Sequence, residues 1–171
     1  MREEGHCVHR ESAPMPSRAP RSCGWHGFRI PGSSVPPRGI SVRADIRGIP
    51  LTPEEQRHAD ALNQALAKLP SYEGPLVRHA GLDPQELERY VPGKPVTEHG
   101  FPYSTLKPDG INPQFVSSQN TEFQIVSKTG KPVGQYATRP DEVMFPSGTG
   151  FMVHDKIVLP NGRVIIQMTE I

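Results

Sequence analysis

Residues 139–151 hold a short strand between two chain breaks, and this stretch constrains the fold more than any other. Its sequence, RPDEVMFPSGTGF, passes from a polar turn directly into an apolar strand, with Glu142 at the junction. Pro146 and Gly148 then end the strand, since Pro and Gly punctuate regular structure. A carboxylate that opens a short, bounded strand is held rigidly at a sheet edge, as a positioned acid must be. The alternative is an ordinary solvated glutamate at a strand end.

The 171-residue chain has the length of one ordinary domain, and its charge is unevenly distributed. Residues 1–50 carry 8 Arg, no Lys and 4 acidic residues, a net charge of +4. Residues 51–171 carry 11 basic and 14 acidic residues, a net charge of −3, and the two parts sum to +1. The acidic part argues against nucleic acid as the main partner, because phosphate binding needs a basic face. No apolar run approaches the roughly 18–20 residues of a membrane span.

Residues 1–48 are rich in Pro, Arg, Ser and Gly and show no helical or strand period, so we expect a disordered arm. The arm lacks the apolar core of a secretory signal peptide. It contains both cysteines, and a small zinc site is one interpretation of Cys7, His9, Cys23 and His26, although their spacing is irregular. Two other interpretations of residues 1–48 are a linker from a larger protein and a stretch that is included because the translation start was assigned too far upstream.

The domain itself is predicted to begin with helices. Thr52 and Glu55 form a capping box around Pro53, and apolar residues follow at helical spacing, which predicts a helix of about four turns that ends near Pro70. A second, shorter helix is expected from Asp83 to just before 92–93. Residues 107–120 are polar and contain Pro and Gly, so we expect a loop of about a dozen residues, as binding loops often are.

Strands dominate the C-terminal third. The pattern predicts strands over residues 122–126, 133–136, 151–154, 156–159 and 163–168, with hairpin turns at 128–131 and 161–162. The turn at 128–131 contains Gly-Lys but lacks the glycine spacing of a phosphate-binding loop. Earlier strands are expected at 76–81 and around residue 96. Together these elements predict an α+β domain over residues 51–171.

Polar residues interrupt the two earlier strand regions. Arg78 lies within an apolar strand, where a guanidinium is costly unless it meets an anion. That anion is either a carboxylate in a structural salt bridge or a bound phosphate, which a guanidinium grips with two parallel hydrogen bonds. Ser104 and Thr105 open a later strand, where hydroxyl residues are also common for structural reasons.

Taken in order, these motifs resemble the mono-ADP-ribosyltransferases of the Arg–Ser–Glu type, a family of bacterial toxins and vertebrate arginine-specific ectoenzymes. The resemblance rests on YEG at 72–74, LVR at 76–78, YVPG at 90–93, GF at 100–101, FQI at 123–125, KTGK at 128–131 and EVMFPSGT at 142–149. It does not extend to residues 1–48. It implies a small α+β fold, mainly antiparallel, with a two-sheet core and N-terminal helices.

The resemblance also implies roles for single residues. Arg78 resembles the family arginine that holds the phosphates of NAD, with His79 beside it. The hydroxyl motif, which orients the nicotinamide ribose and the catalytic acid, corresponds to Tyr103, Ser104 and Thr105. Glu142 resembles the catalytic glutamate, which stabilises the oxocarbenium-like state formed as nicotinamide leaves, as in glycoside hydrolysis. NAD is therefore the expected substrate, and no metal is expected.

Two positions depart from the family pattern. The family motif reads aromatic-x-Ser-Thr-Ser-Leu, and Tyr103 replaces its first Ser. Either Ser104 acts from a shifted position or the tyrosine hydroxyl takes over. Arginine-modifying members carry a Glu two residues before the catalytic Glu, where this chain has Pro140. This second departure concerns the acceptor residue rather than NAD cleavage.

The function that the resemblance implies is transfer of ADP-ribose from NAD to a protein acceptor. A secreted toxin or a delivered effector is the expected setting, with an unidentified target and, for a toxin, an immunity protein as a further partner. NAD hydrolysis with water as acceptor is one alternative. A non-catalytic protein-interaction domain with the same fold is the other.

Overall fold

A computed structural model of the chain describes residues 50–171. The expected arm at residues 1–48 and the zinc interpretation of Cys7, His9, Cys23 and His26 lie outside these residues. The described part contains helices α2 (Pro53–Ala67), α3 (Pro84–Glu88) and α4 (Pro113–Ser117). None of them is long and apolar enough to cross a membrane.

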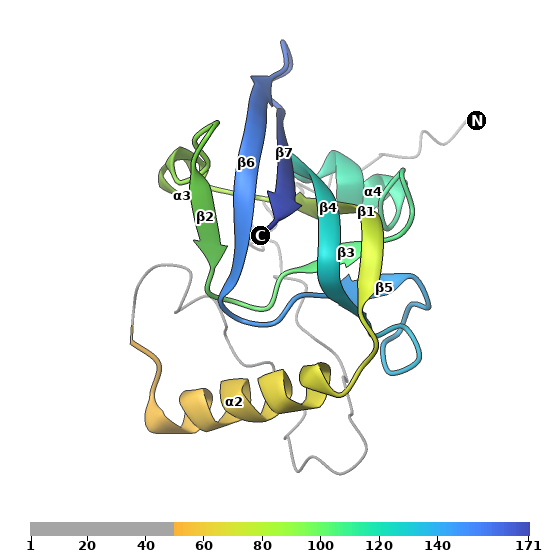
Figure 1. Ribbon diagram of the computed structural model, residues 1–171. Helices are drawn as coiled ribbons and strands as arrows, with labels where there is room; N and C mark the ends of the chain where they lie inside the picture. Colours follow the sequence, from red (N-terminus) through yellow and green to blue (C-terminus); the bar gives the residue numbers. More distant parts are fainter. Residues whose placement is uncertain (1–49) are drawn as a thin grey trace, which may run out of the picture.

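Helix α2 follows directly from its start signal. The Thr52 hydroxyl accepts a hydrogen bond from the Glu55 amide at 3.2 Å, and the Glu55 carboxylate accepts one from the Thr52 amide at 2.8 Å. This reciprocal pair satisfies amides that the first turn leaves free, and it confirms the predicted capping box. In Figure 1 the helix lies across one end of the strands. Its buried residues Ala59 and Leu66 pack there against an apolar cluster completed by Phe101, Val133 and Met144.

Seven strands are joined in the order β1-β3-β5-β4-β7-β6-β2, and β1 pairs in addition with β4. Their bounds are β1 Tyr72–Ala80, β2 Pro95–Glu98, β3 Tyr103–Thr105, β4 Thr121–Pro132, β5 Glu142–Met144, β6 Thr149–Val158 and β7 Val164–Glu170. The β4–β7 pair is parallel and the others are antiparallel, which confirms the mainly antiparallel α+β fold.

The pairing of β1 with β4 closes a ring of strands, β1-β3-β5-β4. Figure 1 shows β3 and β5 running roughly across the direction of β1, β4, β7 and β6. All seven strands form one continuous sheet, so the two sheets expected from the resemblance are joined through the β1–β3 and β4–β5 pairs. The main apolar core lies on the inner face of these strands, and it includes Leu76, Phe123, Ile125, Val143, Phe145, Phe151, Val153, Ile166 and Met168.

The predicted hairpin at 128–131 was wrong, because β4 continues through it. The pairing register shifts between Tyr72 and Gly74, so the polar residues form a bulge in β4. The buried Glu170 carboxylate accepts the Lys128 amide at 2.6 Å and the Thr129 amide at 2.8 Å. These bonds satisfy amides that the bulge removes from the ladder, so the chain does not need to reverse.

The predicted strand at 133–136 was also wrong, since this segment is a turn in which the Tyr136 amide bonds the Val133 carbonyl at 2.8 Å. A side chain at Gly134 would have its Cβ only 2.1 Å from the Pro140 carbonyl oxygen, so this close approach requires glycine. Residues 151–154 and 156–159 were predicted as separate strands, and they lie mainly in the single bulged strand β6.

Candidate active site

Glu142 belongs to a row of directly opposed residues that crosses three strands. Val77 of β1 lies opposite Thr105 of β3, and Thr105 lies opposite Glu142 of β5. Opposed residues project from the same face of a sheet. The hydroxyl of Thr105 and the carboxylate of Glu142 therefore belong to one face. Two residues along β3, Tyr103 lies on this face as well and packs against the apolar cluster under α2.

The Glu142 carboxylate is partly buried, and no residue in 50–171 donates a hydrogen bond to it or forms an ion pair with it. Burial raises the pKa of Glu142 above its usual range; the positive charge of Arg139 opposes this shift, and the negative charge of Asp141 reinforces it. A carboxylate without a partner among residues 50–171 is available to a ligand.

Asp141 is bound into the protein instead. The Thr105 hydroxyl donates a hydrogen bond to its Oδ2 atom, and the Lys107 ammonium lies 3.6 Å from Oδ1. The hydrogen bond from Thr105 is the main reason that the pKa of Asp141 lies below its usual range; burial acts against it and Lys107 adds to it. Asp141 thus ties the turn before Glu142 to strand β3.

Arg78 projects from the other face of the strands. It lies opposite Phe123 of β4, and its guanidinium carbon is 5.0 Å from the centre of the Phe123 ring. Within residues 50–171 no acceptor takes a hydrogen bond from Arg78, and its buried Nη1 atom is without a partner. The structural salt bridge that was one alternative for Arg78 is therefore not formed within the described part of the chain.

Ser104 shares the inner face with Arg78, since it neighbours Thr105 in β3 and lies opposite Val143. It is 2% exposed, and its hydroxyl has no hydrogen-bond partner among the described residues. The strand register therefore divides the predicted residues into two groups. Tyr103, Thr105 and Glu142 lie on one face, and Arg78 and Ser104 lie on the other, in adjacent rows. Along the sheet Glu142 and Arg78 are separated by two strand spacings, about 10 Å.

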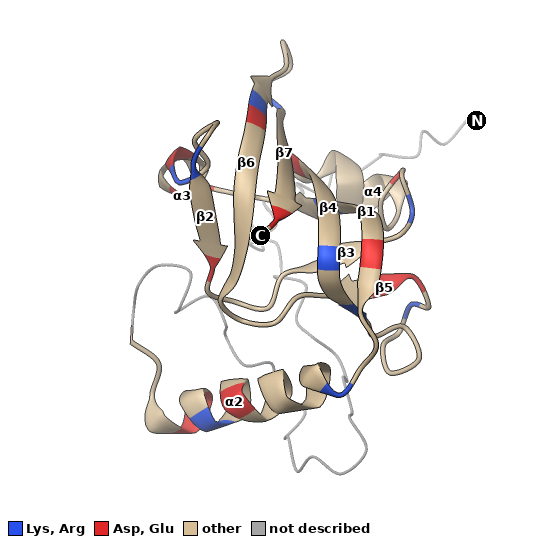
Figure 2. Ribbon diagram, viewed as in Figure 1, with Lys and Arg blue, Asp and Glu red and all other residues tan. Residues whose placement is uncertain are grey.

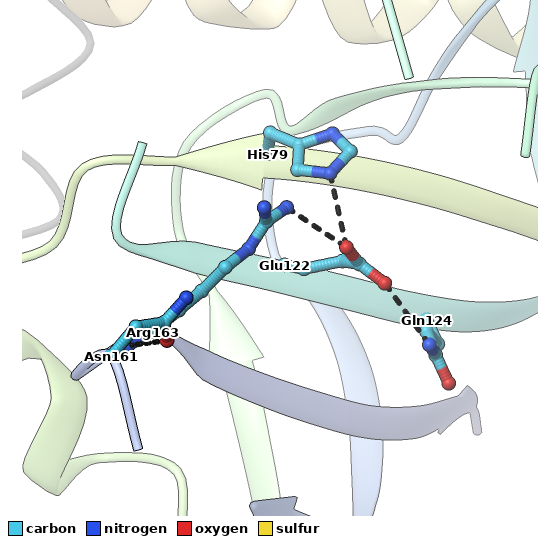
Figure 3. Close-up of polar contacts among 5 residues, drawn as sticks. All are labelled: His79, Glu122, Gln124, Asn161 and Arg163. Carbon is cyan, nitrogen blue, oxygen red and sulfur yellow. Dashed lines mark hydrogen bonds and ion pairs between the residues drawn. The ribbon is translucent and has the colours of Figure 1, made fainter. Parts of the chain in front are cut away.

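His79 is committed elsewhere. Its Nε2 atom lies 3.2 Å from the Glu122 carboxylate, which also accepts hydrogen bonds from Arg163 at 2.9 Å and Gln124 at 3.0 Å (Figure 3). Burial alone would raise the pKa of Glu122, but these hydrogen bonds and the nearby cationic groups hold it below its usual range. These contacts join β1 and β4 to Arg163, just before β7, on the face of β1 opposite to Arg78.

Two further polar residues lie near Arg78 and were missed by sequence reasoning. Tyr90 is 3% exposed and Glu98 is 2% exposed, and the tyrosine hydroxyl donates to the carboxylate. Glu98 occupies an ordinary alternating strand, so only its burial marks it as unusual. Among residues 50–171 no group of three or more His, Cys, Asp and Glu is arranged to hold a metal ion.

Comparison with known proteins identifies the family. Over 119 residues the chain is 43% identical to a protein of Mycobacterium avium (strain 104) named as an NAD(+)–arginine ADP-ribosyltransferase, Mav. The chain is a homologue of the ADP-ribosyltransferases. The match covers 68% of this chain and 14% of the Mycobacterium protein. No protein-family model matches.

Solved structures agree with this relationship. The type III effector XopAI from Xanthomonas axonopodis pv. citri, truncated by 70 N-terminal residues, superimposes with a TM-score of 0.62 at 27% identity, covering 70% of this chain and 54% of that one. The ADP-ribosyltransferase HopU1 of Pseudomonas syringae pv. Tomato DC3000 gives a TM-score of 0.60 at 22% identity, covering 70% and 56% of the two chains. The ADP-ribosyltransferase Vis, in complex with agmatine, gives 0.61 at 16% identity, covering 77% and 67%. The described part of this chain thus has the ADP-ribosyltransferase fold.

Proposed function

We propose that residues 51–171 form a catalytic domain that cleaves NAD between nicotinamide and ribose and transfers ADP-ribose to a protein acceptor. One observation carries the proposal. The two charged residues that the family resemblance assigns to NAD, Arg78 and Glu142, have no hydrogen-bond or ion-pair partner within residues 50–171. Charged groups held in partly buried positions without a protein partner are costly, and a ligand would remove that cost.

The proposed roles follow from the chemistry of each group. Glu142 accepts a hydrogen bond from the ribose and stabilises the positive charge that develops as nicotinamide leaves. Arg78 holds the pyrophosphate, so that binding energy far from the reacting bond orients the ribose. The two residues lie on opposite faces of the strand ladder, about two strand spacings apart. Strand β3 ends at Thr105 and β5 begins at Glu142. The proposal therefore requires NAD to bend around this end of the ladder to contact both residues.

The hydroxyl motif is divided by the same register. Thr105 shares the face of Glu142, and its hydroxyl already donates to Asp141. Ser104 has an uncommitted hydroxyl on the face of Arg78. We assign Ser104 to the NAD-binding group with Arg78, and Tyr103 to the wall of the site beside Glu142. The Nε2 atom of His79 contacts Glu122, while its buried Nδ1 atom has no hydrogen-bond partner within residues 50–171, so the proposed contact of His79 with NAD would have to use Nδ1.

The group that accepts ADP-ribose is a separate question from the cleavage of NAD. Mav is named for transfer to arginine, and Vis has been solved with agmatine, a small guanidinium compound. In this chain Pro140 offers no carboxylate for a guanidinium, Asp141 is held by Thr105 and Lys107, and the charge of Arg139 acts on Glu142. These observations favour hydrolysis by water as the second candidate function.

The test is nicotinamide release from NAD by the purified 171-residue chain, with and without agmatine. We expect release in both conditions, and mass spectrometry separates ADP-ribosyl-agmatine from free ADP-ribose. Binding of NAD without any release of nicotinamide would support the non-catalytic interaction domain. Absence of both binding and release would remove the proposal.

The biological setting is proposed from the relatives. XopAI is named as a type III effector and Vis as a toxin. We propose that this domain likewise acts on a protein of another cell after delivery. In Figure 2 charged residues of both signs are interspersed over the described elements, as expected for a partner that is a protein and not nucleic acid.

A further inference from the structure

The guanidinium of Arg78 is held by an aromatic ring. The ring of Phe123 is 0% exposed, and the Arg78 guanidinium carbon lies 5.0 Å from its centre. A cation above an aromatic ring is attracted by the ring's electron density, and the attraction strengthens when water is excluded. Because Arg78 has no ion-pair partner within residues 50–171, this ring is the contact that fixes the direction of its side chain.

The Phe123 ring is in turn held by Tyr90. The two ring centres are 5.1 Å apart at an interplanar angle of 63°, an edge-on arrangement of the kind that aromatic pairs prefer. Tyr90 lies beyond the end of α3, and its buried hydroxyl donates to the carboxylate of Glu98 at the end of β2. A chain of contacts therefore runs from Glu98 through Tyr90 and Phe123 to Arg78.

We infer that Tyr90 and Glu98 are positioning residues for the NAD phosphates, which act by holding the Phe123 ring on which the Arg78 guanidinium rests. The inference rests on the proposed function, in which Arg78 binds the pyrophosphate. A carboxylate that is 2% exposed is costly in an apolar core, and its hydrogen bond from Tyr90 fixes the tyrosine ring in one orientation.

Electrostatics support the same connection. Burial is the main cause that raises the pKa of Tyr90; the negative charge of Glu98 adds to the shift, and the positive charge of Arg78 opposes it. The tyrosine hydroxyl therefore remains a donor throughout the neutral pH range. The tyrosine hydroxyl thus lies within the electrostatic reach of both Glu98 and Arg78.

The first experiment measures NAD binding by calorimetry to the 171-residue chain carrying Glu142→Gln, a background in which slow turnover does not disturb the titration. Adding Tyr90→Phe is expected to weaken NAD binding by about fivefold, because the guanidinium loses its fixed direction over the ring. Tyr72→Phe is the matched control, since it removes a tyrosine hydroxyl beside the same core without touching the Arg78 contact chain. It should leave the NAD affinity unchanged.

The second experiment tests the coupling to Arg78. In an Arg78→Ala background, Tyr90→Phe should cause no further loss of NAD affinity, since the positioned group is absent. With wild-type Glu142, Tyr90→Phe should raise KM for NAD about fivefold and leave kcat nearly unchanged. An unchanged NAD affinity in folded Tyr90→Phe, an equal loss in the Arg78→Ala background, or a loss confined to kcat would each overturn the inference.

The inference can still be tested if the Tyr90→Phe variant does not fold. If Tyr90→Phe fails to fold because Glu98 loses its donor, the double variant Tyr90→Phe/Glu98→Leu removes both polar groups and restores an apolar core. The same fivefold loss of NAD affinity is expected there, and wild-type affinity would overturn the inference. Failure of the proposed function is a different result, since the unmodified chain would then neither bind nor cleave NAD.

Discussion

Thr105 lies directly opposite Glu142 in the β3–β5 ladder, and its hydroxyl donates a buried hydrogen bond to the neighbouring Asp141. This bond holds the turn that leads into Glu142, so the backbone of the candidate catalytic residue is set from β3. The Glu142 carbonyl also accepts the Val133 amide at 2.9 Å, which fixes the turn from the opposite side. The carboxylate is thereby placed by its neighbours while no described side chain binds it.

The first prediction concerns the charge of Glu142. Glu142→Gln keeps the size of the side chain and removes the charge that would stabilise the oxocarbenium-like state. Nicotinamide release should fall by about 10²–10⁴-fold while NAD affinity changes little, because the charge acts mainly in the transition state. Asp141→Asn is the matched control and should retain most activity. Wild-type turnover in Glu142→Gln would remove the catalytic role from this residue.

The second prediction concerns Thr105. Thr105→Val keeps the shape of the side chain and leaves the buried Asp141 carboxylate without its hydroxyl donor. The free energy of unfolding should fall by about 1–3 kcal/mol, the cost of an unsatisfied buried acceptor, as measured by urea denaturation. Thr105→Ser retains the hydroxyl and should recover most of the loss. Equal stability of the Val and Ser variants would show that the hydrogen bond does not hold the turn.

The third prediction concerns pH. Burial raises the pKa of Glu142 and the charge of Arg139 opposes the shift. If the ionised carboxylate is required, kcat/KM should fall as the pH drops through this raised pKa, above the usual glutamate range. Arg139→Gln removes the opposing charge, so the acid limb of the pH profile should move to higher pH. Arg139→Lys keeps the charge and should hold the limb near its original position. A shift to lower pH in Arg139→Gln would contradict the assignment.

The fourth prediction concerns the acceptor. Pro140→Glu would place a carboxylate two residues before Glu142, in the turn that leads into β5. A second carboxylate there can bind a guanidinium through paired hydrogen bonds. The fraction of ADP-ribose transferred to agmatine rather than to water should therefore rise, measured by mass spectrometry of the products. Pro140→Gln, which is uncharged, is the comparison, and an equal product ratio in the two variants would argue against a charge effect.

The fifth prediction concerns the β4 bulge. The buried Glu170 carboxylate accepts two backbone amides of the bulge and the hydroxyls of Ser127 and Thr129. Glu170→Ala should lower the free energy of unfolding by about 3 kcal/mol, since amides bonded to a charged acceptor lose their partner. The urea midpoint measures the change, and Glu73→Ala, which alters an exposed side chain of β1, is a control that should be nearly neutral. A neutral Glu170→Ala would mean that the bulge is held by the strand pairing alone.

Several parts of the molecule could be predicted from local residue order. These parts are the capping box at Thr52, the apolar period of α2 and the alternation of Phe123 and Ile125. Each depends on residues that are close together in the sequence, so its pattern is visible without the fold. The order of short motifs was sufficient for the family resemblance, which the Mycobacterium relative confirms. The bulge at 128–131 was mistaken for a turn because the group that satisfies it, Glu170, is supplied from the far end of the chain.

The sequence by itself determined the starts of α2 and α3, most of the strands, and the candidate residues Arg78 and Glu142. It missed α4, which lies within the expected loop at 107–120. Only the tertiary structure decided which face Arg78 and Glu142 each occupy, because faces depend on strand register, and register is set by pairing between distant segments. The contact chain from Glu98 to Arg78 has the same origin. The roles of Tyr90 and Glu98 depend on their burial and on the side chains around them. These surroundings form only when β2, β4 and the segment that follows α3 pack around one core.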